Sequence, residues 1–157
     1  FRYGNGRNPQ KQPHLKNKIM FLKKEDLYAK IRKNELEQIT GNDDTLVLHA
    51  MQAAVSEMEP YLKERYNTKD IFTKQDRERN PLLVSFAVDI AIFEIISIAL
   101  PGQDLQDRRE RYKRAIDYLK QVRDEKLNLE LPKKENTLQG GGDTAAHGSN
   151  PKRNNYF

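Results

Sequence analysis

The longest apolar stretch of the chain is residues 81–100, PLLVSFAVDIAIFEIISIAL, which is hydrophobic on nearly every side. Asn80 followed by Pro81 is typical of a helix start, and Pro101-Gly102 is typical of a helix end. We therefore expect a helix of about 20 residues, roughly 30 Å long at 1.5 Å per residue. A helix that is apolar all round lies either in a membrane or at the centre of a bundle.

Two carboxylates and the flanking patterns favour the bundle. Asp89 and Glu94 lie in the middle of the stretch, and each would cost about 2.5–3.5 kcal/mol at the centre of a bilayer. Amphipathic helical patterns precede and follow the stretch, and their apolar faces need a partner. We therefore expect no membrane span. Asp89 should meet an arginine or a backbone donor in the bundle, or an interface between subunits, because a buried charge needs a partner.

The pattern before the central helix predicts two helices. The first spans residues 24–38, ends near Thr40-Gly41, and has a sparse apolar stripe formed by Leu27, Ile31 and Leu36. The second is capped by Asp43 or Asp44 and runs to about Tyr66, and Pro60 should kink or break it. Its apolar positions follow the spacing of one buried helix face: Val47, Met51, Ala54, Met58, Tyr61 and Leu62.

Residues 67–79 form a polar, charged connection, from which Ile71-Phe72 should fold back onto the body. The last helix runs from about residue 104 to 126, with an apolar stripe of Leu105, Tyr112, Ala115 or Ile116, Leu119 and Val122. Residues 127–131, LNLEL, alternate apolar and polar, which is typical of a short strand or an extended strip. We predict an all-α fold: a small bundle of about four helices around the central apolar helix, with extended N- and C-terminal arms.

The outer face of the last helix is dense in charge: Arg108, Arg109, Glu110, Arg111, Lys113 and Arg114. A solvated face with pairs four residues apart, such as Glu110 with Arg114, is the simplest interpretation. The residues that we expect in the core or at interfaces are Asp89, Glu94, Arg108, Arg109 and Tyr112.

The formal net charge of +5 is unevenly distributed. Residues 1–19 carry five bases and no acid, and residues 132–157 carry four bases against two acids, so residues 20–131 have a small excess of acids. This asymmetry predicts a basic N-terminal arm (1–19), a helical body (20–131) and a C-terminal tail (132–157). Basic arms of this kind suggest contact with something anionic.

Each arm has two interpretations. Residues 1–19 show no hydrophobic period and are either a solvated tail or an arm that docks on a partner or on phosphate. Three glycines at 140–142 predict a flexible linker in the tail. The tail ends in NPKRNNYF, whose aromatic side chains either have no role or anchor the tail in a partner's pocket. The candidate partner-binding residues of the arms are Arg2, Arg7, Lys11, Lys16, Lys18, Lys152, Arg153, Tyr156 and Phe157.

The sequence offers no residues for catalysis or for a bound group. It has no cysteine, and His14, His49 and His147 lie far apart. No glycine motif of a phosphate-binding loop and no GxSxG is present. Asp89 and Glu94, five residues apart, lie on different helix faces and do not form an acid–base pair. We expect a protein that is not an enzyme and binds no metal or cofactor.

The order of several segments carries a resemblance: MFLKKEDL at 20–27, EPYLKERYNT at 59–68, NPLLVSFAVDIAIFEI at 80–95, DRRERYKRAIDYLKQV at 107–122 and then LNLELP. Over about residues 20–132 the chain resembles the small all-helical head–tail connector proteins of tailed bacteriophages, particularly the Mu-like neck or head-completion family. No single motif among these segments is catalytic. The resemblance gives no guide to the arm before Met20, where family members usually begin, or to the long tail.

The resemblance implies a subunit of a homo-oligomeric ring, expected to be twelve-fold, between the portal protein and the tail or neck proteins. Such a ring would close the filled head in the neck of the virion, after assembly in the host cytoplasm, and could touch packaged DNA without sequence specificity. The alternative hypothesis is a nucleic-acid-binding module that uses the basic arm and the face from Arg108 to Arg114. The small acidic excess of the body and the lack of an aromatic stacking platform weigh against it.

Overall fold

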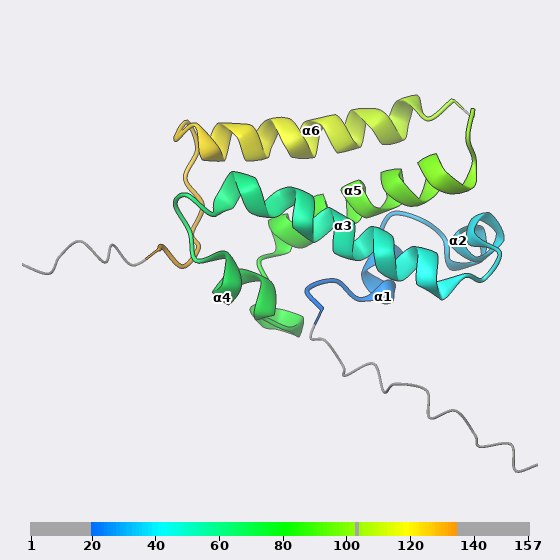
Figure 1. Ribbon diagram of the computed structural model, residues 1–157, viewed down its shortest axis with the longest axis horizontal. Helices are drawn as coiled ribbons and strands as arrows, with labels where there is room; N and C mark the ends of the chain where they lie inside the picture. Colours follow the sequence, from blue (N-terminus) through cyan, green and yellow to red (C-terminus); the bar gives the residue numbers. More distant parts are fainter. Residues whose placement is uncertain (1–19, 103, 135–157) are drawn as a thin grey trace, which may run out of the picture.

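The computed structural model describes residues 20–102 and 104–134. Over these residues the chain is all α-helical apart from one turn of 3-10 helix, and it contains no strand. Figure 1 shows the elements in chain order: α1 (Lys24–Leu27), α2 (Lys33–Thr40), α3 (Asp44–Leu62), α4 (Thr68–Thr73), η1 (Asp76–Glu78), α5 (Pro81–Ala99) and α6 (Gln106–Arg123). The predicted fold class is therefore confirmed.

The central helix, α5, begins and ends close to its predicted bounds. The side-chain oxygen of Asn80 accepts hydrogen bonds from the backbone N–H groups of Leu82 and Leu83, at 3.0 and 3.1 Å, and Pro81 is the first helical residue. Helices α1, α2, α3 and α6 all contact α5, and in Figure 1 α6 runs along the top with α5 and α3 beneath it. Nine residues of α5 are buried, so this helix forms the middle of a single hydrophobic core.

By length and composition alone, α5 could cross a membrane. The structure gives its apolar side chains other partners, because α3 packs on one side of it and α6 on another. Burial of an aliphatic side chain contributes about 1.5–3 kcal/mol, and α5 supplies more buried side chains than any other described helix. The prediction that this stretch forms the centre of a bundle is confirmed.

Helix α3 is capped by Asp43, whose carboxylate accepts from the backbone N–H groups of Thr45 and Leu46 at 2.8 and 3.2 Å. The helix continues through Pro60 and ends at Leu62, so the prediction of a helix running to Tyr66 is wrong. Arg65 and Tyr66, which follow the end of the helix, are instead bound to the end of α6 and the chain after it, as described below.

The predicted first helix over residues 24–38 is wrong as a single element, since it is two short helices with a turn between them. Leu27, Ile31 and Leu36 are all buried, but a spacing of five residues puts Leu36 about 140° from Ile31 on a continuous helix. The turn over residues 28–32 brings all three side chains to the same core. Gly41, in the left-handed region at φ 61°, ends α2 where predicted.

The connection over residues 67–79 contains helix α4, which the sequence analysis did not predict. Asn67 caps it by accepting from the backbone N–H of Asp70 at 3.2 Å. Ile71 is buried, and the Phe72 ring lies edge-on to Phe21 with centroids 5.1 Å apart. The expectation that this pair folds back onto the body is confirmed.

Helix α6 is shorter than predicted at both ends. Both Ala115 and Ile116 are buried, together with the predicted Leu119 and Val122. The segment LNLEL is not a strand, and its three leucines pack against the core. The single bridge recorded near it joins Tyr66 to Lys133.

Candidate functional site

The predicted arm residues lie outside the part of the chain that the structure describes: Arg2, Arg7, Lys11, Lys16, Lys18, Lys152, Arg153, Tyr156 and Phe157. The structure does describe where each arm joins the body. It also describes the five residues expected in the core or at interfaces: Asp89, Glu94, Arg108, Arg109 and Tyr112.

Asp89 pairs with a lysine and not with an arginine or a backbone donor. The Lys30 amine lies 2.6 Å from Oδ2 of Asp89, and it also donates to the hydroxyl and the carbonyl of Ser85 at 2.7 and 2.8 Å. Both side chains are largely buried, with 19% of Lys30 and 12% of Asp89 exposed. The second carboxylate oxygen of Asp89, Oδ1, is buried without a hydrogen-bond partner.

Arg108 also contacts Lys30, through the backbone of that residue. Its guanidinium donates to the backbone carbonyl of Lys30 at 3.1 Å. The turn between α1 and α2 is thus bound through its side chain to α5 and through its backbone to α6. Sequence reasoning missed Lys30, which is separated from Asp89 by 59 positions, and its spacing in the sequence carries no signal for this pairing.

Tyr112 lies at the interface between α6 and the rest of the core. Its ring stacks on Phe93 with centroids 4.7 Å apart and an interplanar angle of 27°, and its hydroxyl donates to the Glu57 carboxylate. This hydrogen bond and the partial burial raise the pKa of Tyr112 to about 12. Glu94 is half-buried and Arg109 is exposed.

Residues 20–23, the N-terminal root, join the predicted arm to the body. The Gln75 amide donates to the Met20 carbonyl at 3.0 Å, and Arg79 donates to the Phe21 carbonyl at 2.8 Å. Lys23 forms an ion pair with Asp76. The three contacts fix the position and direction at which the chain enters the body.

Asp26 strengthens this root by pairing with the same arginine. Its two carboxylate oxygens accept from Arg79 at 2.5 and 3.0 Å, and one also accepts from the backbone N–H of Lys23 at 2.7 Å. Burial would raise the pKa of Asp26, but the hydrogen bonds from Arg79 and Lys23 outweigh it and lower the pKa below its usual value.

Residues 127–134, the C-terminal root, are bound to the residues that follow α3. Arg65 donates to the carbonyls of Val122 and Leu127 at 2.7 and 3.1 Å, and the Tyr66 hydroxyl accepts from the backbone N–H of Leu129 at 3.0 Å. Two backbone hydrogen bonds follow at 2.9 and 3.1 Å, from Asn67 to Pro132 and from Lys134 to Arg65.

Both roots are therefore bound by the segment that links α3 to α5, residues 63–80. Gln75, Asp76 and Arg79 bind the N-terminal root, while Arg65 and Asn67 bind the C-terminal root. The predicted polar connection thus positions both places where a charged arm joins the body.

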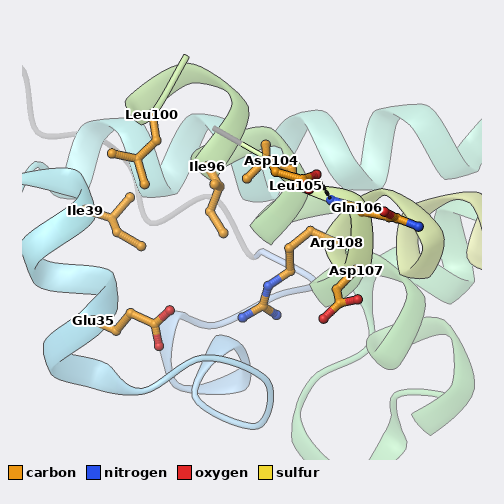
Figure 2. Close-up of a pocket in the computed structure, with 9 residues that line it drawn as sticks. All are labelled: Glu35, Ile39, Ile96, Leu100, Asp104, Leu105, Gln106, Asp107 and Arg108. Carbon is orange, nitrogen blue, oxygen red and sulfur yellow. Dashed lines mark hydrogen bonds between the residues drawn. The ribbon is translucent and has the colours of Figure 1, made fainter. Parts of the chain in front are cut away.

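A groove of about 430 Å³ lies at the far end of α5, between α2 and the start of α6. Figure 2 shows its residues. Four apolar side chains, Ile39, Ile96, Leu100 and Leu105, line it together with the carboxylates of Glu35, Asp104 and Asp107. In the view of Figure 2 the Arg108 guanidinium lies between Glu35 and Asp107. This acidic groove combines an apolar lining with an excess of negative charge.

The outer face of α6 is basic over part of its length, since Arg109, Arg111, Lys113 and Arg114 are all exposed. Glu110 accepts a hydrogen bond from Gln106 at 3.1 Å. It forms no ion pair with Arg114, so that predicted pairing is wrong.

Among residues 20–102 and 104–134, no group of three or more His, Asp or Glu side chains is placed to bind a metal ion.

No curated protein matches the sequence. The sequence model of the family described as Bacteriophage Mu, Gp36 matches residues 21–147. The match begins one residue after the predicted start of the body at Met20, and it continues beyond residue 132, into the predicted tail. Because it covers most of the chain, the protein belongs to this family of bacteriophage Mu proteins.

Proposed function

We propose that the protein is a structural subunit of a ring in the neck of a tailed phage, between the portal and the tail. It would bind neighbouring copies within the ring and other virion proteins on its two sides, without enzymatic activity. Membership of a bacteriophage protein family supports a role in the phage particle. The resemblance to head–tail connectors, carried by the order of the segments in the sequence, supports the position in the neck.

The observation that carries the proposal is the attachment of both arm roots to one segment of the body. A ring subunit needs contacts that extend beyond a small helical body, and extended arms add contact area without enlarging that body. A defined exit point increases the affinity that an arm contributes, because the part of the segment that is already ordered costs no further entropy on binding. Six residues of the connection between α3 and α5 define those points: Arg65, Tyr66, Asn67, Gln75, Asp76 and Arg79.

The test is the mass of the purified full chain, alone and mixed with the portal protein of the same phage. Analytical ultracentrifugation should show a large oligomer in at least one of these conditions, and electron micrographs should show rings. A mass equal to one chain in both conditions would refute the proposal. Micrographs would also give the number of copies, which we expect to be twelve.

A shortened chain tests the role of the N-terminal arm. Deleting residues 1–18 leaves every described contact of the N-terminal root in place, so the far-ultraviolet circular dichroism of the body should not change. Ring formation or portal binding should be lost or weakened. Loss of helical structure on deletion would show that the body extends further towards the N-terminus than residue 20.

The alternative function is nucleic-acid binding by the basic side of α6, which is favoured by the exposure of Arg109, Arg111, Lys113 and Arg114. Asp107, Glu110 and Asp117 lie on the same helix and reduce the local positive charge. Binding of double-stranded DNA by the isolated protein that weakens steeply between 50 and 200 mM salt, as expected for several phosphate contacts, would support this alternative.

A further inference from the structure

The lining of the acidic groove matches a partner that is both apolar and basic. Its lining exposes part of Ile39, Leu100 and Leu105 to solvent. Glu35, Asp104 and Asp107 are all exposed. Three carboxylates and one base, Arg108, leave an excess of two negative charges at the groove. Arg108 also donates a hydrogen bond to the Lys30 carbonyl.

The chain itself contains a segment with the matching chemistry. Residues 1–19 have five bases and no acid, and Leu15 in that segment is followed closely by Lys16 and Lys18. The C-terminal tail matches less well, because Glu135 and Asp143 accompany its bases. We propose that residues 15–18 of one copy bind in the acidic groove of a second copy, with Leu15 on the apolar lining and the two lysines on the carboxylates.

The geometry of the body favours a neighbouring copy over the same chain. Gln75 and Arg79, which bind the N-terminal root, precede α5, whereas Ile96 and Leu100 of the groove lie at its end. The 19 residues of α5 span about 28 Å at 1.5 Å per residue. Leu15 is five residues before Met20, and five residues of extended chain span at most about 18 Å. This is shorter than α5, so the geometry favours the groove of a neighbouring copy.

A root at one end of α5 and a groove at the other end produce a head-to-tail contact. Repetition of such a contact closes into a ring when the rotation between copies allows it. The inference thus rests on the proposed ring and names the contact that joins its subunits. Opposite charges on the two surfaces would also select this pairing over wrong ones.

A charge exchange between two full-length variants tests the contact. One variant carries Lys16→Glu and Lys18→Glu, and the other carries Glu35→Lys and Asp107→Lys. Each variant alone places like charges on both surfaces and should oligomerise at least tenfold more weakly than the natural chain. An equimolar mixture should regain the oligomer, because each arm then meets a groove of opposite charge on the other variant.

The control variant carries Glu25→Lys and Glu64→Lys, two exposed carboxylates that do not line the groove. It changes the net charge as much as the groove variant does, and it replaces one acid in the first turn of a helix, Glu25, where the groove variant replaces two, Glu35 and Asp107. It should oligomerise as the natural chain does, and circular dichroism should show all variants folded. Unchanged oligomers in both charge-reversed variants, or no recovery in their mixture, would overturn the inference while the ring proposal stands.

Carbodiimide cross-linking of the natural oligomer locates the contact directly, because it joins a lysine amine to a carboxylate that touches it. A mixture of isotope-labelled and unlabelled chains separates links between copies from links within one copy. Mixed-label peptides joining Lys16 or Lys18 to Glu35, Asp104 or Asp107 are expected. Links found only within one copy would overturn the inference. A natural chain that stays monomeric under every condition would refute the ring and this contact together.

Discussion

Replacing Lys30 by methionine should destabilise the protein more than replacing Asp89 by alanine, although the two side chains form one ion pair. The difference follows from their other partners. Lys30 has three acceptors, and two of them, the carbonyl and the hydroxyl of Ser85, remain when Asp89 is removed. Asp89 has a single donor, because its Oδ1 atom is buried without a partner. Loss of Lys30 therefore leaves a buried carboxylate with no hydrogen bond.

The magnitudes follow from burial. Removing one partner of a buried ion pair costs about 3–5 kcal/mol. With 12% of its side chain exposed, Asp89 is slightly accessible to water, so we expect Lys30→Met to lower the free energy of unfolding by about 3 kcal/mol. Asp89→Ala should cost about 1–2 kcal/mol, since the amine keeps Ser85 and is itself 19% exposed. The double variant should be more stable than Lys30→Met alone, because it removes the unpaired carboxylate.

Urea denaturation of the full chain, followed by circular dichroism, measures all four members of this cycle. Lys33→Met is the matched control: it breaks an exposed pair with Glu37, in which the two charged atoms are 3.9 Å apart, and should cost at most about 1 kcal/mol. Equal losses for the two single variants, or losses that simply add in the double variant, would refute the argument from the number of hydrogen bonds.

Two further predictions concern other pairs of the body. Tyr112→Phe keeps the ring that stacks on Phe93 but loses the bond to Glu57, and should cost about 1–2 kcal/mol at pH 7. Folding raises the pKa of Tyr112 to about 12, so the stability contributed by its hydroxyl is complete below pH 10 and is lost as the pH rises through 12. Urea denaturation should therefore show the stabilities of the natural chain and of Tyr112→Phe converging over that range. Folding lowers the pKa of Asp26, so its contribution is present above about pH 4 and is lost as the pH falls through the lowered value. Arg79→Met should lower the free energy of unfolding by about 2–4 kcal/mol near neutral pH. The stability of this variant should change less between pH 5 and pH 3 than that of the natural chain. An equal acid dependence in both proteins would contradict the role of Arg79 in lowering the pKa of Asp26.

Local chemistry made the two ends of α5 predictable. Asn80 and Pro81 begin the helix through their own side chains, and Pro101-Gly102 follows directly after the apolar stretch and marks its end. The same kind of signal was available for α4 and was missed. Asn67 followed by Asp70 three residues later is a helix start of the capping type, but the high charge of residues 67–79 favours a polar connection.

The division between α1 and α2 depends on contacts that no local pattern encodes. The turn that separates them is bound by Asp89 of α5 and Arg108 of α6 through one residue, Lys30. Sequence reasoning identified Asp89 as a residue that needs a partner, because a buried charge must be compensated, and expected Arg108 in the core or at an interface. It could not name the partner, because pairing between segments 59 and 78 positions apart depends on how the helices pack.

Composition predicts the bounds of the two arms, but the points at which they join the body depend on packing. Charge alone marked residues 1–19 and 132–157 as different from the body. Only the structure shows that their roots share one segment, which donates side-chain and backbone hydrogen bonds to backbone carbonyls of both. A backbone carbonyl accepts a hydrogen bond whatever the side chain of its residue, so these bonds fix the path of a root without restricting its sequence. The side chains that these bonds require are therefore those of the donors Arg65, Gln75 and Arg79. The roots also contribute buried or partly buried side chains of their own, Phe21 and Leu22 at one root and the three leucines of LNLEL at the other, so their apolar positions must be kept while their other positions can vary.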